Sequence, residues 1–378
     1  MKLSCTRDNL HQGLSITSHL TTKNVNLPIL QNVLVKAEGG VIRFTTTNLE
    51  IAISCSVRGK VEEAGEYTIP SKLFFDYVSL LPNETVTLEK DGEAVHIKSG
   101  SYKTKINGLA SSEFPLVPSV QANRSYQIPV NEFKTALSQV LFSVATNESR
   151  PELTGIYTKF SPAEGESVLT LASTDSYRLS EKVIPLVSPI EQEDVIILPS
   201  RTLAEINRIL SVFKDDVESP SVVTLELSDN QAVFKYGSVE LISRVIEGNY
   251  PDYQQIIPTQ FNTEAILDRD DFIKSVKTAS LFSRTGLFDV TLEFDPEERQ
   301  LAVKAVDATR GENTTNCSAE VSGKNNNVTV NFRYLLDGLN AMKCEKVKFG
   351  MIDASNPCLV VPHESKDKHR YVVMPIRQ

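Results

Sequence analysis

Side chains that could catalyse a reaction are thinly spread along this 378-residue chain. It has no phosphate-binding glycine loop, dinucleotide fingerprint, zinc-protease helix or nucleophile elbow. Asp175 and Asp307 recur at matching positions and could serve as general acid or base in a hydrolase. That chemistry would need a second titratable group converging on the same place, and the sequence shows none. We therefore expect no enzyme activity and no cofactor.

Two polar runs could be taken for metal sites. One is the run 362–369, which contains His363 and His369, and the other is the acidic run 268–271. None of the five histidines has metal-ligand spacing, so the first run is better explained as a solvated turn between two strands. Carboxylates suit the positive end of a helix dipole, so the second is better explained as a capped helix start. We expect no metal site.

Three basic residues each stand in the first turn of a predicted helix, where the helix dipole disfavours a cation. Each is followed four residues later by an acid. The pairs are Lys72/Asp76, Arg201/Glu205 and Arg333/Asp337. One interpretation is a local ion pair, worth only about 0.3–0.5 kcal/mol on an exposed helix. The other is that the three bases meet phosphates on one shared surface. The sequence leaves both open.

Composition sets the class of protein. The net charge is −9, which argues against a whole surface that grips nucleic acid but allows a basic stripe on an acidic body. No tryptophan and no aromatic-interleaved basic patch is present, so base stacking on single strands is not expected. The five cysteines lack paired spacing, which predicts reduced thiols. No signal peptide or membrane-length apolar run is visible, and we expect a cytoplasmic protein.

The chain repeats one pattern three times. A first helix is predicted over 7–20, 130–144 and 269–282, with Asp8, Asn131 and Asp270 as N-caps. A second helix is predicted over 69–81, 198–210 and 330–342. Self-similarity at this spacing indicates three similar domains.

Between the helices lie β-branched, alternating runs at 41–56, 168–183 and 289–306, and turn signals at 90–92 and 228–230 predict hairpins. Helix and strand runs without βαβ alternation favour an α+β fold with antiparallel sheets. A short element recurs at 45–48, 172–175 and 304–307. We place the domains at 1–122, 123–258 and 259–378.

The whole chain resembles the bacterial DNA polymerase III beta subunits, the sliding clamps. The most specific motifs are 27–30 (LPIL), 174–179 (TDSYRL), 250–253 (YPDY) and 371–377 (YVVMPIR). The resemblance implies three clamp domains, each with two helices packed on antiparallel sheets, and a head-to-tail dimer that closes a six-domain ring around duplex DNA. It implies a processivity factor without catalysis, which tethers the replicative polymerase and is bound by the clamp loader and repair polymerases through short linear motifs.

The resemblance also assigns residues to three surfaces. The partner-peptide pocket would comprise Leu153, Thr174, Ser176, Tyr177, Arg178, Leu179, Pro251, Gln255, Ile256, Val372, Val373, Met374, Pro375, Ile376 and Arg377. Basic residues on or near the helices would face DNA: Lys23, Lys72, Lys134, Arg150, Arg201, Arg208, Lys274, Lys277 and Arg333. The dimer seam would use Lys103, Thr104, Lys105, Leu281 and Phe282, with Thr104 standing where the family has an aromatic residue.

Two other functions compete with this interpretation. An enzyme would need the missing second catalytic group near Asp175 or Asp307. A scaffold of repeated domains that does not bind DNA would show the same three repeats but would give a polymerase no processivity.

Overall fold

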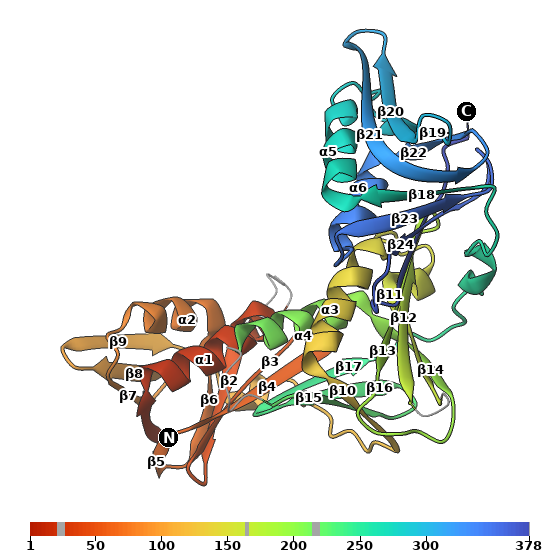
Figure 1. The fold of residues 1–378 in the computed structure, drawn as a ribbon. Helices are drawn as coiled ribbons and strands as arrows, with labels where there is room; N and C mark the ends of the chain where they lie inside the picture. Colours follow the sequence, from red (N-terminus) through yellow and green to blue (C-terminus); the bar gives the residue numbers. More distant parts are fainter. Residues whose placement is uncertain (21–26, 163–165, 214–219, 378) are drawn as a thin grey trace. The chain divides into compact units, whose positions relative to one another are not determined.

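The computed structural model describes residues 1–20, 27–162, 166–213 and 220–377. Its contacts divide the chain into two compact units. The first unit consists of Met1–Val130 and Ala204–Val245, and the second of Asn131–Leu203 and Ile246–Gln378. Figure 1 labels the elements along the chain. Lys23, predicted to face DNA, lies outside the described residues.

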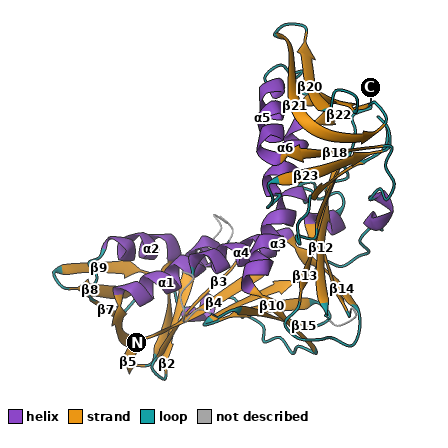
Figure 2. Cartoon of the chain, in the orientation of Figure 1, coloured by secondary structure: helices purple, strands orange, loops and turns teal. Residues whose placement is uncertain are grey.

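The first unit holds two antiparallel sheets within the described residues. The five-stranded sheet has the order β5 (Lys60–Glu63), β1 (Lys2–Thr6), β7 (Thr85–Asp91), β8 (Ala94–Ser99) and β9 (Tyr102–Asn107). The eight-stranded sheet has the order β10 (Arg124–Pro129), β15 (Val222–Leu227), β16 (Gln231–Tyr236), β17 (Val239–Arg244), β4 (Ile51–Arg58), β3 (Val41–Thr47), β2 (Asn32–Glu38) and β6 (Gly65–Pro70). The helices α1 (Arg7–Thr17) and α2 (Ser71–Leu80) contact each other, and α1 also packs on β4 (Figure 2).

The second unit is built on one long antiparallel sheet. Its order is β14 (Asp194–Pro199), β11 (Gly155–Ser161), β12 (Val168–Thr174), β13 (Arg178–Pro185), β25 (His369–Val373), β24 (Cys358–Pro362), β23 (Lys346–Met351), β18 (Thr263–Asp268), β21 (Gly311–Gly323), β20 (Gln300–Asp307), β19 (Asp289–Asp295) and β22 (Asn326–Asn331). The helices α5 (Arg269–Ser280) and α6 (Phe332–Ala341) contact each other. Two of the sequence boundaries between the units fall within helices, one at the start of α3 (Val130–Val140) and one inside α4 (Ser200–Val212).

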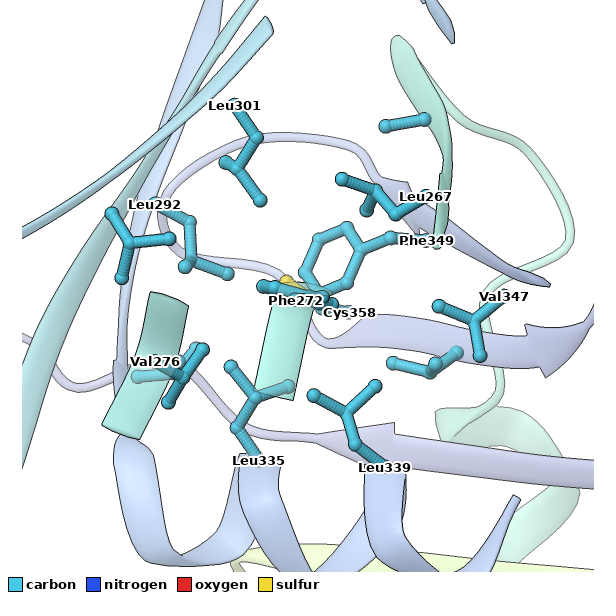
Figure 3. Close-up of a cluster of buried hydrophobic side chains, with 14 of the residues drawn as sticks. Leu267, Phe272, Val276, Leu292, Leu301, Leu335, Leu339, Val347, Phe349 and Cys358 are labelled. Atoms are coloured by element: carbon cyan, nitrogen blue, oxygen red, sulfur yellow. The ribbon is translucent and has the colours of Figure 1, made fainter. Parts of the chain in front are cut away.

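The core of the second unit is formed by the apolar faces of its helices and strands. Phe272 and Val276 of α5 are spaced by one helical turn and so point to one side, as do Leu335 and Leu339 of α6 (Figure 3). They face alternate residues of the sheet, such as Phe349 on β23. Because these side chains are fully buried, truncating Phe272 to alanine would cost about 3–5 kcal/mol.

The predicted elements are confirmed, and their starts need correction. All six predicted helices and both hairpins are present in the described part of the chain, and every described strand pair is antiparallel. The N-cap of α1 is Thr6, whose hydroxyl accepts the backbone N–H of Asn9, and the N-cap of α5 is Asp268, which accepts from Asp271. The predictions of Asp8 and Asp270 were wrong by two residues.

The physical reason is that a cap residue keeps an extended backbone, which lets its side chain reach an N–H two or three residues on. Asp8 and Asp270 already lie in the first helical turn, where their charge still suits the dipole. Asn131 likewise lies inside α3, which begins at Val130. The acidic run 268–271 is a capped helix start as predicted. Of the run 362–369, residues 363–368 join β24 to β25 as predicted, but Pro362 ends β24, and His369 begins β25 and is buried.

Among the residues described, no helix is both long and apolar enough to cross a membrane.

Candidate functional site

The motif at 174–179 forms a tight turn between β12 and β13, held by side-chain hydrogen bonds. The Thr174 hydroxyl donates to the carbonyl of Arg178 (2.7 Å) and accepts the N–H of Ser176 (3.1 Å). Asp175 Oδ1 accepts the backbone N–H groups of Tyr177 and Arg178, each at 3.0 Å. These bonds hold Ser176 at φ 76°, a left-handed conformation that costs a non-glycine residue energy.

The guanidinium of Arg178, which follows this turn, is held in place by contacts with acidic and aromatic side chains. Its Nε donates to Asp175 Oδ2 (3.0 Å) and its Nη1 to Asp337 Oδ2 on α6 (2.5 Å). The guanidinium carbon lies 4.6 Å from the ring centroid of Tyr334 and 5.5 Å from that of Phe142. Burial alone would lower the pKa of Arg178, but Tyr371 and the two aspartates outweigh burial and raise it. The side chain is therefore a positioned, permanent charge.

The C-terminal segment is anchored to this turn. On β25, Val372 pairs with Leu179 and Val373 with Arg178. The backbone N–H of Met374 donates to the carbonyl of Tyr177 (2.9 Å). Beyond it, Pro375 forms a bridge with Val330, and the N–H of Ile376 donates to Thr329 (2.8 Å). Every residue of β25 except Arg370 is buried, whereas residues 374–376 are half-exposed and could offer apolar surface.

An apolar cluster lies beneath the turn. Its buried members are Ala172, Leu179, Tyr253, Ile257 and Val372, and its half-buried members are Tyr157, Tyr250, Ile256 and Leu359. The hydroxyl of Tyr253 donates to Glu181 (2.7 Å), which satisfies the polar end of a buried ring. Aromatic and aliphatic side chains around one fixed cation can bind an apolar peptide anchor and orient its polar flank.

The structure brings some predicted pocket residues together and leaves others apart. Thr174, Ser176, Tyr177, Arg178, Leu179, Ile256 and residues 372–374 share the turn, the β25 pairing or the cluster beneath them. Leu153 is buried, Pro251 is half-exposed, and the Gln255 amide donates to Asp252 (2.8 Å). Arg377 is exposed.

The sequence prediction missed residues that hold Arg178 in place, chiefly Asp337 and Tyr334. The sequence left open an ion pair between Asp337 and Arg333, four residues earlier on the same helix, but Asp337 binds Arg178 instead. Arg333 lies over the ring of Phe288, 3.6 Å from its centroid. Of the two interpretations left open for Arg333 and Asp337, the local ion pair is therefore not formed in the described part of the chain, because the i, i+4 spacing ignores competing partners from other elements. An exposed aspartate on α6, far along the chain from the turn at 174–179, gives no signal of this contact in a single sequence.

The basic residues predicted to face DNA differ in what binds them. Six are exposed and two half-buried; the exposed ones are Lys72, Arg150, Arg201, Lys274, Lys277 and Arg333, and the half-buried ones Lys134 and Arg208. Within the described ranges no ion pair is formed by the lysines, which are Lys72, Lys134, Lys274 and Lys277. Of the two interpretations left open for Lys72 and Asp76, the local ion pair is thus not formed among the residues that the structure describes. These ammonium groups, on α2, α3 and α5, are available for phosphates.

Among the arginines of the set, Arg150 and Arg208 each form an ion pair within the chain. Arg150 donates to Glu152 (3.0 Å). Arg208 binds Glu205 (2.5 Å) and donates to the carbonyls of Ser15 and Ile16, so it satisfies carbonyls near the C-terminal end of α1. Its geometry supports a structural role, and its DNA-facing role stays a prediction.

Three of the five residues predicted for a dimer seam are exposed, namely Lys103, Lys105 and Leu281, and Thr104 and Phe282 are half-buried. Lys103, Thr104 and Lys105 occupy β9, the edge strand of the five-stranded sheet. Leu281 follows α5 with 67% of its surface exposed, and Phe282 packs partly against the core of the second unit. The structure describes a single chain, so their pairing stays a prediction.

A buried polar group stands behind the pocket strand β25. His369 Nε2 lies 2.8 Å from Ser180 Oγ, and that hydroxyl lies 2.5 Å from the carbonyl of Gln139. Since serine has one proton and a carbonyl only accepts, Ser180 donates to Gln139 and accepts from Nε2–H of a neutral imidazole. Burial, together with the nearby Lys182, lowers the pKa of His369 to about 3. Lys182 is itself ion-paired with Asp367.

Other chemistry finds little support in the geometry. No group of three or more potential metal ligands occurs within the described residues. All five cysteines are free thiols, and only Cys344 is not buried. The carboxylates of Asp175 and Asp307 each accept backbone N–H groups within their own turns. Neither is set up as a general base.

Comparison with known proteins gives matches along the whole chain. Three family models match in succession: the DNA polymerase III beta subunit N-terminal domain over residues 1–118, its central domain over 127–252 and its C-terminal domain over 254–377. The beta sliding clamp of Synechocystis sp. is 31% identical over 401 residues, covering 100% of this chain and 99% of the relative. That of Synechococcus elongatus is 32% identical over 382 residues, with the same coverage.

Solved structures agree with the sequence matches. The DNA polymerase sliding clamp from Bacillus subtilis superposes with a TM-score of 0.92 at 25% identity, covering 100% of this chain and 99% of that one. The architecture and the sequence thus point to the same relatives.

Proposed function

Because this chain belongs to the DNA polymerase III beta subunit family and is a sliding clamp of DNA replication, we propose residue-level roles for its helices, pocket and edges. The family is a non-catalytic processivity factor, so the expected lack of enzyme activity follows from membership. DNA and the polymerase are its partners, and the ring is a homodimer of three-domain subunits. The alternative of a scaffold that does not bind DNA is not favoured.

The ring proposal rests on one type of strand pairing that joins two of the repeats into a continuous sheet. This pairing occurs twice within the chain, and the two strands that would form a third copy of it are not paired with each other. In the first unit, β17 pairs with β4 so that Ser243 lies opposite Ile51. In the second unit, β25 pairs with β13 so that Val373 lies opposite Arg178. Ile51 and Arg178 each stand three residues after the recurrent Asn48 or Asp175. Each junction therefore continues a sheet by the same rule.

The two strands of the third pairing, β9 and the first half of β21, are both present but do not pair with each other. In the described part of the chain, β9 pairs only with β8, and the first half of β21 pairs only with β20. The rule would set Arg310, three residues after Asp307, opposite Ile106, and Glu312 opposite Thr104 of a second copy. Two such junctions would close a head-to-tail ring, since a heterologous interface that closes gives a cyclic dimer. An open strand edge is otherwise an aggregation hazard.

Exposed apolar side chains near these open edges support the same seam. On one side they are Leu73, Leu80 and Tyr102, and on the other Leu281, Leu287 and Val306. Burying them against each other would favour association by roughly 25 cal/mol for each Å² of apolar surface. Thr104, although small and polar, would sit within the strand pairing, where its backbone forms the contact.

The unpaired lysines on α2, α3 and α5 would meet DNA phosphates. A clamp that holds DNA by topology needs only weak contacts that are independent of sequence, because tight base contacts would hinder sliding. A net charge of −9 with lysines gathered on helices fits this division. Arg201 and Arg333, at positions equivalent to Lys72, would extend the same surface.

The turn at 174–179, the cluster beneath it and residues 372–376 would form the partner pocket. A short motif with an apolar anchor would contact Leu179, Ile256 and Val372, and Arg178 would orient its polar flank. The clamp loader and repair polymerases would compete with the replicative polymerase for this pocket. We place this function in the cytoplasm and keep the domain boundaries near residues 122 and 258 as predictions.

The ring is tested by light scattering over a dilution series from micromolar downward. We expect a mass of twice 41.9 kDa, falling towards the monomer only at high dilution. A mass of 41.9 kDa at every concentration would refute the self-closing ring, because both open edges would then be unused.

A further inference from the structure

The turn of the proposed partner pocket has a copy in the first unit. The Thr47 hydroxyl donates to the carbonyl of Ile51 (2.9 Å) and accepts the N–H of Leu49 (3.0 Å). Asn48 Oδ1 accepts the N–H groups of Glu50 (3.0 Å) and Ile51 (2.8 Å). These bonds match one for one those of 174–178. Leu49 even has the φ of 76° found at Ser176.

The surroundings of the turn are copied as well. The strand that follows it, β4, pairs with β17 as β13 pairs with β25. The boundary segment 114–118 is the counterpart of 250–253. Together they enclose a groove of about 500 Å³. It is lined by Thr47, residues 49–52, residues 115–118, Gln231 and residues 242–244.

Two apolar side chains that line this groove are exposed to solvent. Phe114 and Val117 pack into a small core with Ile29 and Leu30, which anchors the boundary segment on both sides of Leu116. Leu116 itself is 98% exposed and Leu49 is 52% exposed. Pro115 and Pro118 restrict the backbone around them to extended conformations. Single exposed leucines are ordinary, but two that line one groove on a pre-set backbone mark a binding surface.

The charges of the groove indicate what it would bind. Arg244 is exposed, and its guanidinium forms no ion pair with any described residue. Glu50, the acid in the lining, interacts within the chain. In the second unit, by contrast, the cation Arg178 is already neutralised by two aspartates. The groove of the first unit therefore offers apolar walls and one unneutralised cation, which complements an apolar side chain followed by a carboxylate.

We propose that the groove at 47–52, 115–118 and 242–244 is a second docking site, for a short extended peptide with a leucine-type anchor next to an acidic residue. Its ligand class rests on the proposed function of the first pocket, while its geometry is independent of that pocket. The anchor packs between Leu49 and Leu116, and the carboxylate pairs with Arg244. A ring of two subunits then carries two kinds of peptide site.

Methyl NMR on the intact protein, with labelled leucine, isoleucine and valine methyl groups, tests this proposal. The probe is the peptide acetyl-Ser-Gly-Leu-Leu-Asp-Gly-amide, titrated to millimolar concentration, and the control peptide carries Asn in place of Asp. We expect saturable shifts of the Leu49 and Leu116 methyl groups. Binding should weaken about tenfold with the Asn peptide and with Arg244→Gln, the value of one charge-assisted hydrogen bond.

Other methyl groups separate the alternatives. The methyl groups of Leu179 and Val372 report on the first pocket, and those of the exposed Val187 serve as a control. Movement at Leu179 and Val372 without movement at Leu49 and Leu116 would overturn the second site and leave the first intact. Movement at neither pair would overturn both for this ligand chemistry. Shifts at Leu116 that follow protein concentration without peptide would instead show a second copy covering the groove, which also overturns the proposal.

Discussion

Acid should destabilise the second unit through one buried histidine. The pKa of His369 is about 3 in the folded protein, against 6.5 for an ordinary histidine. Between these values the unfolded chain binds a proton that the folded chain does not. Stability is therefore fully present above pH 6.5 and is lost as the pH falls from 6.5 towards 3.

The size of the effect follows from the two pKa values. Each pH unit below 6.5 costs about 1.4 kcal/mol, so about 2 kcal/mol should be lost at pH 5. The cause is local, because Ser180 already accepts Nε2–H and the buried His369 Nδ1 has no hydrogen-bond partner among the described residues. A second proton would therefore place an unpaired charge there. Lys182 adds repulsion. Since β25 also carries Val372 and Val373, the same loss should loosen the partner pocket.

The assay is urea unfolding followed by circular dichroism at pH 7.5, 6 and 5, comparing the wild type with His369→Gln. Glutamine keeps an N–H donor for Ser180 but cannot be protonated. We expect the free-energy difference between the two proteins to shift by about 2 kcal/mol, in favour of the variant, from pH 7.5 to pH 5. An unchanged difference across this range would refute the assignment of a neutral, buried His369.

Three further perturbations test the proposed surfaces. Arg178→Ala should weaken binding of a partner-motif peptide at least tenfold and cost about 3 kcal/mol of stability, because it leaves the carboxylates of Asp175 and Asp337 without their cation. Unchanged affinity, measured by fluorescence anisotropy, would show that Arg178 is not part of the pocket. Leu281→Asp should give a monomer by light scattering where Val195→Asp, at another exposed apolar position, does not; a dimer in both would place the seam elsewhere. The double variant Lys274→Ala, Lys277→Ala should reduce the salt dependence of DNA affinity by about two phosphate contacts and leave the melting temperature unchanged; an unchanged salt slope would exclude these lysines from the DNA surface.

Much of the fold could be predicted because its signals are local. Hydrophobic periodicity set the helices, and turn residues set hairpins such as the one at Gly92, whose φ of 58° suits glycine. Threefold repetition gave the domain count. The predicted N-cap positions were wrong because several residues near each helix start have a side chain that could cap it. Only the backbone geometry selects among Thr6, Asp8 and their equivalents.

The candidate site was harder to predict, because long-range contacts decide it. One partner of Arg178 is Asp337, 159 residues away, whereas sequence spacing offered only Arg333 as a local partner for that acid. The apolar cluster joins Leu179 to Val372 through a strand pairing that no local pattern reveals. The duplicate turn at Thr47 was visible as a recurring element, but its matching hydrogen bonds and exposed Leu116 needed coordinates.

The central claim is that two copies close around DNA through β9 and β21, and linkage to circular DNA tests it most directly. The variant Thr104→Cys, Glu312→Cys, in a Cys344→Ser background, places a thiol on each side of the proposed seam. Cross-linking with a short bis-maleimide in the presence of plasmid should lock rings on the circle. We predict protein that stays with circular DNA in detergent and is released when the plasmid is cut once. Efficient cross-linking with no retention on the circle would contradict the account.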